Sequence, residues 1–179
     1  MTAESIHGAS TLCFSFDPAV TCCFTGHRVL PKGQRQTIET ALCAEIDALV
    51  AQGYTDFVAG GALGFDTLAA LCVVRKRALL GSVRPIRLHL FLPCPEQSDN
   101  WDESDRLLYR RILAAADTGR YVSPHYTRSC MLDRNRAMVD VSSVLIAYLT
   151  RDTGGSAYTV RYAKQTGKVV TFVGEHFGV

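Results

Sequence analysis

The sequence predicts an α/β fold, a three-layer, Rossmann-like, doubly wound domain with a mainly parallel sheet of five to six strands. Short apolar runs typical of buried strands alternate with longer segments of helical periodicity along the chain. Glycine or proline ends most of the apolar runs, as turns at strand ends require. The length of 179 residues suits a single domain, which we expect at 19–179 after an N-terminal arm at 1–18.

The first half of the chain predicts three strands, each followed by a helix. The run VTCCFT is rich in strand-forming residues and stops at Gly26. Apolar positions then recur at helical spacing from Lys32 to a glycine C-cap at Gly53, and a second strand and helix repeat this pattern. A third strand stops at Pro93. We therefore expect strands at 20–25, 55–59 and 87–92 and helices at 32–52, 63–80 and 102–116.

The second half of the chain continues the alternation. The helix at 102–116 has four apolar residues that we place on its inner face: Leu107, Leu108, Ile112 and Leu113. The run SVLIAYLT predicts a fully buried strand, because it is apolar at almost every position. The remaining elements expected are strands at 120–123, 143–150 and 168–173 and helices at 130–141 and 155–166.

Composition and charge are those of an ordinary globular protein. Hydrophobic residues make up 47% of the chain and charged residues 20%. The net charge of +2 is too small to indicate a polyanionic partner by itself. Because no apolar run is long enough to cross a bilayer and the first residues lack a signal-peptide pattern, we expect a cytoplasmic protein without membrane association.

The cysteines do not indicate a metal site. None of them forms a CxxC pair or a zinc-binding spacing. Most occupy apolar stretches, so we interpret them as small buried hydrophobic residues in a reducing compartment. The seven cysteines are Cys13, Cys22, Cys23, Cys43, Cys72, Cys94 and Cys130.

The turn after the first strand is the first candidate ligand-binding segment. It contains Thr25, Gly26, His27 and Arg28, which bring a hydroxyl, a flexible backbone, an imidazole and a guanidinium to the sheet edge. A guanidinium can bind two oxygens of a phosphate or carboxylate at once. The alternative is that Arg28 pairs with a surface acid and His27 caps the turn.

The turn after the second strand reads GGALGFD and opens a helix. Glycines let the backbone approach a ligand, and the amides and dipole at a helix N-terminus attract anions. The pattern is neither the dinucleotide fingerprint nor a P-loop. Asp66 either binds a ribose hydroxyl, acts as an acid or base, or only stabilises the helix N-terminus. The candidate residues here are Gly60, Gly61, Ala62, Gly64 and Asp66.

A second glycine-rich helix start follows the apolar strand at 143–150. Its candidate residues are Thr153, Gly154, Gly155 and Ser156. Two such starts on one sheet edge favour a phosphate-binding pocket. Arg134 and Asn135, near the N-terminal end of the preceding helix, are expected to reach the same crevice, although a solvated helix face is the alternative. Trp101 either stacks on a base or fixes its own loop.

Together these turns resemble the YpsA-like branch of the SLOG superfamily, which also contains the LOG phosphoribohydrolases and the DNA-processing protein DprA (Smf). The similarity covers residues 20–173. The resemblance implies a Rossmann-like fold that binds nucleotides or nucleotide-derived ligands, and it implies no established reaction. The matching segments are FTGHR at 24–28, GGALGFD at 60–66, NW at 100–101, LDRNRAMVD at 132–140 and TGGS at 153–156.

The sequence departs from the LOG pattern at the residue that would matter for catalysis. LOG proteins have a glutamate after their glycine-rich turn, whereas TGGS is followed here by Ala157, Tyr158 and Thr159. LOG-like hydrolysis therefore does not transfer directly. If the chain is an enzyme, Asp66 is the candidate catalytic carboxylate, with Arg28 and Arg134 holding phosphate.

We rank three hypotheses of function. The first is a binding or sensing module for a nucleotide-like small molecule, and the second is an enzyme acting on the glycosidic bond of a nucleotide. The third is DprA-like binding of single-stranded DNA through the arginines of two helices: Arg106, Arg110, Arg111, Arg134 and Arg136. No cofactor is required, and Mg²⁺ is expected only as the companion of a bound phosphate. By analogy with related domains we expect a homodimer.

Overall fold

The computed structural model describes residues 15–174, which form an α/β structure with a six-stranded parallel sheet. The strands are β1 (Thr21–Gly26), β2 (Asp56–Ala59), β3 (Arg87–Leu92), β4 (Thr118–Tyr121), β5 (Val144–Tyr148) and β6 (Val169–Phe172). The helices are α1 (Arg35–Ala51), α2 (Phe65–Leu80), α3 (Glu103–Ala115), α4 (Cys130–Asp140) and α5 (Gly155–Gln165), with short 3₁₀ turns η1 (Pro18–Val20) and η2 (Pro95–Ser98).

The strand order is β4-β3-β2-β1-β5-β6, and every neighbouring pair is parallel. The chain therefore starts in the middle of the sheet, builds one side to β4, and then crosses back to add β5 and β6 beside β1. In β1 and β5, Cys22 is paired with Val144 and Gly26 with Tyr148. The switch in strand order thus lies between β1 and β5, where open α/β sheets bind their ligands.

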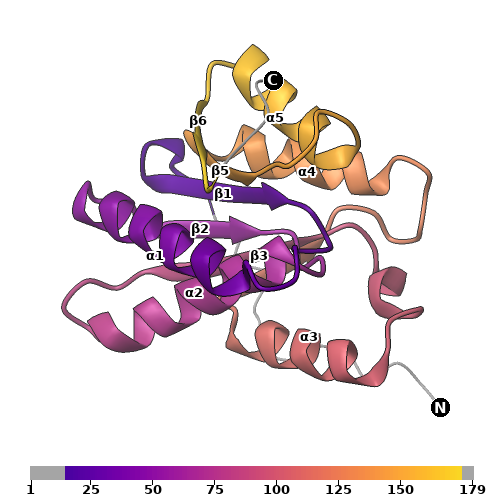
Figure 1. Ribbon diagram of the computed structural model, residues 1–179, viewed down its shortest axis with the longest axis horizontal. Coiled ribbons are helices and arrows are strands. Elements are labelled where there is room, and N and C mark those ends of the chain that lie inside the picture. The colour runs from indigo at the N-terminus through magenta and orange to yellow at the C-terminus, as the bar shows by residue number, and fades with distance from the viewer. Residues whose placement is uncertain (1–14, 175–179) are drawn as a thin grey trace.

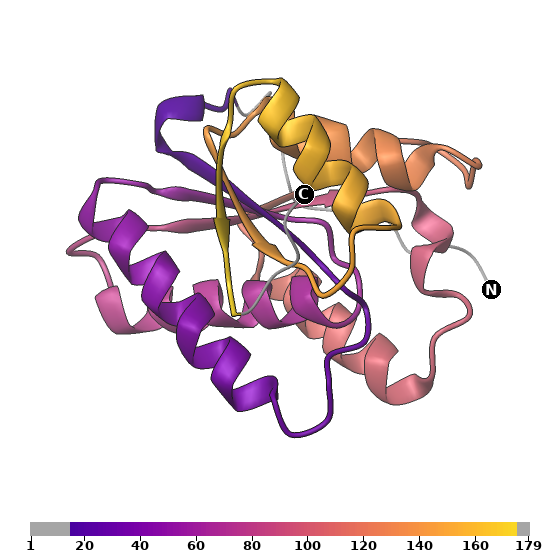
Figure 2. The same cartoon turned by 45° about the horizontal axis from the view of Figure 1, so that its top comes forward.

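Helices cover both faces of the sheet, which confirms the expected three-layer arrangement (Figures 1 and 2). Helices α1, α2 and α3 pack on one face, where the core includes Leu42, Phe57 and Leu90. Helices α4 and α5 pack on the other face over Val58 and Leu145. Successive residues of a strand point to opposite faces of the sheet, and those of the central strands are apolar on both faces, as a sheet buried on both faces requires.

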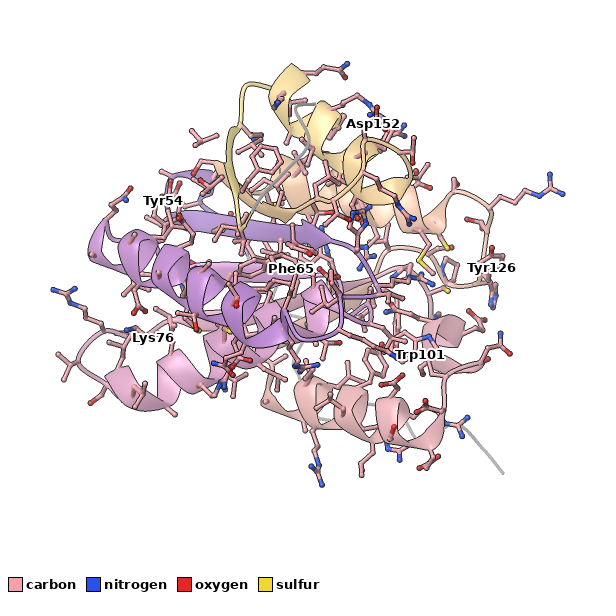
Figure 3. All side chains as sticks on the ribbon, in the orientation of Figure 1. Tyr54, Phe65, Lys76, Trp101, Tyr126 and Asp152 are labelled. Atoms are coloured by element: carbon pink, nitrogen blue, oxygen red, sulfur yellow. The ribbon has the colours of Figure 1, made fainter. Side chains whose placement is uncertain are left out.

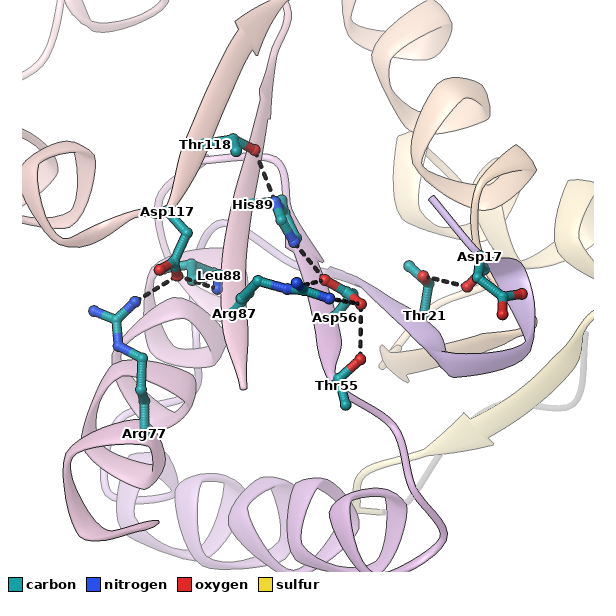
Figure 4. Close-up of polar contacts among 10 residues, drawn as sticks. All are labelled: Asp17, Thr21, Thr55, Asp56, Arg77, Arg87, Leu88, His89, Asp117 and Thr118. Atoms are coloured by element: carbon teal, nitrogen blue, oxygen red, sulfur yellow. Dashed lines mark hydrogen bonds and ion pairs between the residues drawn. The ribbon is translucent and has the colours of Figure 1, made fainter. Parts of the chain in front are cut away.

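A polar network ties the N-terminal ends of the strands together, at the end of the sheet opposite the turns discussed above (Figure 4). Asp56 of β2 accepts hydrogen bonds from the Nε and Nη2 of Arg87, at 2.7 and 2.8 Å. His89 of β3 is buried and joins Asp56, 2.8 Å from its Nε2, to Thr118 of β4, 2.7 Å from its Nδ1. Because both carboxylate oxygens are engaged, this network supports the pairing of β2, β3 and β4.

Three details differ from the sequence-based expectations. The first helix begins at Arg35 rather than at residue 32, and β4 occupies Thr118–Tyr121 rather than 120–123. Leu107 was wrongly placed on the inner face of α3, because it is 43% exposed while Tyr109 and Ile112 are buried there. Most of the expected arm at 1–18 lies outside the described residues. None of the described helices is both long enough and apolar enough to span a membrane.

Candidate functional site

A cavity of about 480 Å³ lies at the C-terminal edge of the sheet, at the switch between β1 and β5. Its walls come from the turns after β1 and β5 and from the first turns of α2, α4 and α5. The predicted site residues that line it are Thr25, Gly26, His27, Arg28, Ala62, Asp66, Arg134, Asn135, Thr153, Gly154, Gly155 and Ser156. Residues from five separate segments are therefore brought together in one hollow.

Two hydrogen bonds join the turn after β1 to the turn after β5. The Nε2 of His27 accepts a hydrogen bond from the amide of Thr150 at 2.9 Å, so Nδ1 carries the proton of the neutral ring. The hydroxyl of Ser156 donates to the carbonyl of Gly26 at 2.8 Å. Burial, and next the nearby Arg151, lower the pKa of His27. The imidazole is therefore held in its neutral form and links the turn after β1 to the turn after β5.

Asp66 lies in the first turn of α2 and organises the glycine-rich turn before it. Its Oδ2 accepts hydrogen bonds from the amides of Gly60 and Ala62, at 3.1 and 3.3 Å. Arg134 of α4 approaches the same oxygen, with its Nη1 at 3.5 Å. Burial raises the pKa of Asp66, although Arg134 and the two amides favour the charged form. The carboxylate thus has a structural role in the turn as well as a place in the cavity wall.

Arg134 is a buried cation with incomplete compensation. Its side chain is 6% exposed, and burial lowers its pKa, an effect that Asp66 opposes and Arg28 reinforces. An Nη1–Oδ2 separation of 3.5 Å is longer than a good charge-assisted hydrogen bond. A buried charge normally needs closely paired partners to offset its lost hydration. This guanidinium is therefore suited to binding an additional anion.

The start of α5 adds further anion-binding groups. Gly154 precedes the helix with a φ of +88°, and no side chain of the described residues caps the first turn. Gly155 and Ser156 belong to that turn and line the cavity. The free backbone amides of the turn and the positive end of the helix dipole therefore lie at the cavity wall. Arg28 and Arg151 are exposed and also line the cavity. Among the described lining residues, Asp66 is the single carboxylate, so the cavity carries net positive charge.

Comparison with known proteins places this chain in a family. A family model named YpsA, described as the YspA SLOG family, matches residues 31–172. The chain belongs to this family. A UPF0398 protein from Bacillus cereus strain ATCC 14579 is 27% identical over 144 residues, which cover 76% of this chain and 74% of that protein. Another from Bacillus cereus strain G9842 is 28% identical over 142 residues, covering 75% and 73% of the two chains.

Two solved structures of DNA processing protein A share the fold of this YpsA-family chain. The Helicobacter pylori protein, which was analysed for its mode of binding single-stranded DNA, superposes with a TM-score of 0.60 at 20% identity. The Streptococcus pneumoniae protein superposes with a TM-score of 0.61 at 16% identity. The alignments cover 86% and 85% of this chain but 64% and 49% of those longer chains.

Some predicted residues of this YpsA-family member do not line the cavity. Gly60, Gly61 and Gly64 are absent from its lining, and they allow the turn to pass close to other segments. A Cβ at Gly60 would overlap the Arg134 guanidinium, and one at Gly64, where φ is +77°, would overlap a backbone carbonyl. Trp101 packs edge to face against Tyr109, with ring centroids 5.2 Å apart, and lies beside α3, well away from Asp152 of the β5–α5 turn (Figure 3). The structure therefore does not bring Trp101 to this cavity.

The cavity also contains residues that the sequence analysis missed: Phe24, Val29, Met131, Thr150 and Arg151. Arg151 directly precedes the TGGS turn, so its position was a usable signal. Met131 is one helical turn before Arg134, and that spacing also places both on one face. The Nη2 of Arg28 lies 4.0 Å from the Met131 sulfur, a contact across 103 residues that no local pattern reveals. In the described part of the chain, no cluster of three or more His, Cys, Asp or Glu side chains could hold a metal ion.

Proposed function

We propose that this chain binds a nucleotide or a nucleotide-derived small molecule through a phosphate group, and that it acts as a binding or sensing module. The observation that carries the proposal is Arg134, a buried guanidinium in the wall of a cavity with a single carboxylate partner at 3.5 Å. A phosphate in the cavity would supply the negative charge and acceptor oxygens that Asp66 provides incompletely.

The surroundings of Arg134 support the same ligand class. Arg28 and Arg151 add positive charge, and the first turn of α5 adds backbone amides. The volume of about 480 Å³ falls within the usual range for small-molecule sites. The position at the switch between β1 and β5 is where related sheet topologies hold nucleotides. The proposal needs no resident cofactor. A di- or triphosphate ligand could bind together with its own Mg²⁺.

The enzymatic alternative depends on Asp66. This carboxylate lines the cavity, and burial raises its pKa, as general acids and bases often require. Its Oδ2 is engaged by two backbone amides, which favours a structural role. Binding of single-stranded DNA ranks third, because Arg106 and Arg110 of α3 both pair with Glu103, at 3.0 and 2.9 Å. Turnover of a nucleotide to its free base would favour the enzymatic alternative. Binding of single-stranded DNA that weakens steeply with salt would favour the third.

A thermal-shift screen tests the proposal with nucleoside mono- and diphosphates, NAD and ADP-ribose. A ligand at about a hundredfold over its dissociation constant stabilises the native state by about 2.7 kcal/mol. For a domain of this size that corresponds to a rise of roughly 5–10 °C in the melting temperature. Absence of any shift from every compound would reject the proposal.

A matched pair of variants at Gly155 locates the binding site. Apart from the adjoining residues and the backbone of its own helix, no atom lies within 4 Å of a Cβ built at Gly155, so the position has room for a side chain. Gly155→Asp places a carboxylate at the anion site, and Gly155→Asn places a neutral group of nearly the same shape there. We expect the ligand-induced shift to disappear in the aspartate variant and to survive, at least in part, in the asparagine variant. Equal ligand-induced shifts of the melting temperature in both variants would show that the phosphate does not bind at the start of α5.

A further inference from the structure

Two cysteines from neighbouring helices meet at the interface between α1 and α2, which lie side by side on one face of the sheet (Figure 1). Cys43 of α1 donates a hydrogen bond to the sulfur of Cys72 of α2, and the two Sγ atoms are 3.2 Å apart. Both residues are free thiols. Because a disulfide bond is about 2.0 Å long, a shift of roughly 1 Å would bring the two sulfurs to bonding distance.

Two ion pairs hold α1 against α2 on either side of these thiols. Glu39 of α1 pairs with Arg75 of α2. Asp47 of α1 pairs with Lys76 of α2 at 2.7 Å. Glu39 and Asp47 lie about one helical turn before and one after Cys43, on the same face of α1. The two helices are therefore positioned by other side chains, and the sulfurs approach each other without a bond between them.

Exposure distinguishes the two thiols. Cys43 is partly exposed, and it is the one cysteine among the described residues that is not buried. Cys72 is 1% exposed, and burial raises the pKa of its thiol to about 12. The contact with Cys43 adds to that rise, whereas Arg75, whose Nη2 lies 3.5 Å from the Cys72 sulfur, opposes it. A dissolved oxidant therefore reaches Cys43 first, while Cys72 stays protonated beside it.

We propose that Cys43 and Cys72 are a redox modification site, at which a hydroperoxide converts the two thiols to a disulfide that links α1 to α2. The Cys43 thiolate attacks a peroxide oxygen, the O–O bond breaks, and hydroxide leaves as the sulfur becomes a sulfenic acid. Cys72 then attacks that sulfur, the S–O bond breaks, and the departing hydroxide takes the Cys72 proton to form water. The two thiols thus lose two electrons and two protons, and one hydrogen peroxide molecule becomes two molecules of water.

The other cysteines of the described residues do not offer a comparable pair. Cys22 and Cys23 are adjacent in β1, and their side chains belong to the cores on opposite faces of the sheet. Cys94 and Cys130 are neighbours, but both are 0% exposed, so a dissolved oxidant has no direct access to either. Cys13 lies outside the described residues, so the experiment must identify which cysteines are linked.

The cross-link would join the helices that follow two parts of the cavity wall. Helix α1 follows the turn that carries Arg28, and the first turn of α2 contains Asp66. Neither Cys43 nor Cys72 lines the cavity, so the inference goes beyond the proposed function and does not depend on it. Because the two cysteines are 29 positions apart in the sequence, the bond would also restrain the unfolded chain and so stabilise the fold.

Peptide mapping after oxidation tests the site. The full chain, reduced and then freed of reductant, is treated with a small excess of hydrogen peroxide, unfolded in an alkylating reagent and digested. Cys43 and Cys72 fall in one tryptic peptide, 36–75, so a second cleavage after Glu45 is needed to separate them. We expect a pair of disulfide-linked fragments that dithiothreitol separates. The cross-linked chain should also melt roughly 5–10 °C higher than the reduced chain, as closure of a loop of this length predicts.

Two variants separate the roles of the thiols. In Cys72→Ala the second step has no partner, so the sulfenic acid of Cys43 should accumulate and be trapped by dimedone. In Cys43→Ala, Cys72 should remain reduced at the same peroxide concentration. The control Cys94→Ala, which removes a buried cysteine elsewhere, should form the cross-link as the wild type does.

The proposal is overturned if the oxidised wild type lacks the disulfide between Cys43 and Cys72, or if Cys43 is linked instead to another cysteine or to a second chain. Oxidation of Cys72 at the wild-type rate in Cys43→Ala would overturn the order of the two steps. The peptide map and the melting temperature are measured on the wild-type chain, so they decide the existence of the site even where a variant fails to fold.

Discussion

The ion pair between Arg134 and Asp66 can be tested by a double-mutant cycle with Arg134→Met, Asp66→Asn and the double variant. Both side chains are nearly inaccessible, and their charged atoms are 3.5 Å apart. At an effective dielectric constant of about 20, Coulomb's law gives an attraction of about 5 kcal/mol. Removing one partner leaves the other charge buried, which typically costs about 3–5 kcal/mol. Each single variant should therefore lose about 3 kcal/mol of unfolding free energy, and the double variant clearly less than their sum.

Urea titration is the appropriate assay, because guanidinium chloride would screen the charges. Arg134→Met should also change the pH dependence. Burial already raises the pKa of Asp66, and loss of the cation raises it further. A carboxyl with a raised folded-state pKa destabilises the fold as pH rises. The loss of unfolding free energy that comes from ionised Asp66 in this variant should therefore be present at pH 7 and vanish below about pH 4. The exposed arginine of the same helix, Arg136→Met, is the control. A coupling free energy below about 0.5 kcal/mol would refute the ion pair as a determinant of the site.

Three further predictions concern single positions. Because the pKa of His27 is lowered, the unfolding free energy should fall as pH drops below about 6.5, and His27→Gln should remove this slope in urea titrations. Gly64→Ala should cost about 2 kcal/mol, since its φ is +77° and a Cβ would overlap backbone, whereas Gly155→Ala should be neutral or stabilising in the same assay. Asp56→Asn should cost about 2–3 kcal/mol at pH 7. Burial raises the pKa of Asp56, but hydrogen bonds from His89 and Arg87 outweigh it and lower the pKa, so that cost should shrink below about pH 4.

The fold was predictable because most elements have strong local signals. The run at 143–150 is apolar throughout, and β5 lies within it at Val144–Tyr148. Glycines mark the ends of β1 and β2, so their turns were located correctly. β4 was displaced by two residues because it is an edge strand whose side chains are mostly exposed, which leaves no apolar pattern to mark its start. Local patterns therefore define the buried strands better than the edge strand.

The candidate site was predictable where its residues lie in the turns that follow the strands. The glycine-rich turns and Arg28 follow directly from strand ends in a parallel sheet. The burial of Tyr109 and Gln97 could not be inferred in this way, because it depends on how α3 and η2 fold over the Gly60-Gly61 turn. A tyrosine within a charged helix resembles a surface residue in sequence. Helical spacing placed Leu107 inward, and the tertiary packing instead selected Tyr109.

The pairing of β1 with β5 has a consequence for the order of events during synthesis. Cys22 and Val144 lie opposite each other in neighbouring strands of the sheet, although more than a hundred residues separate them in the chain. Closing so long a segment carries a large entropic cost and slows folding. One wall of the cavity follows β1 and the opposite wall follows β5. A nascent chain that ends before residue 156 lacks one wall of the cavity, so a ligand bound there could stabilise the chain only after that residue has been synthesised.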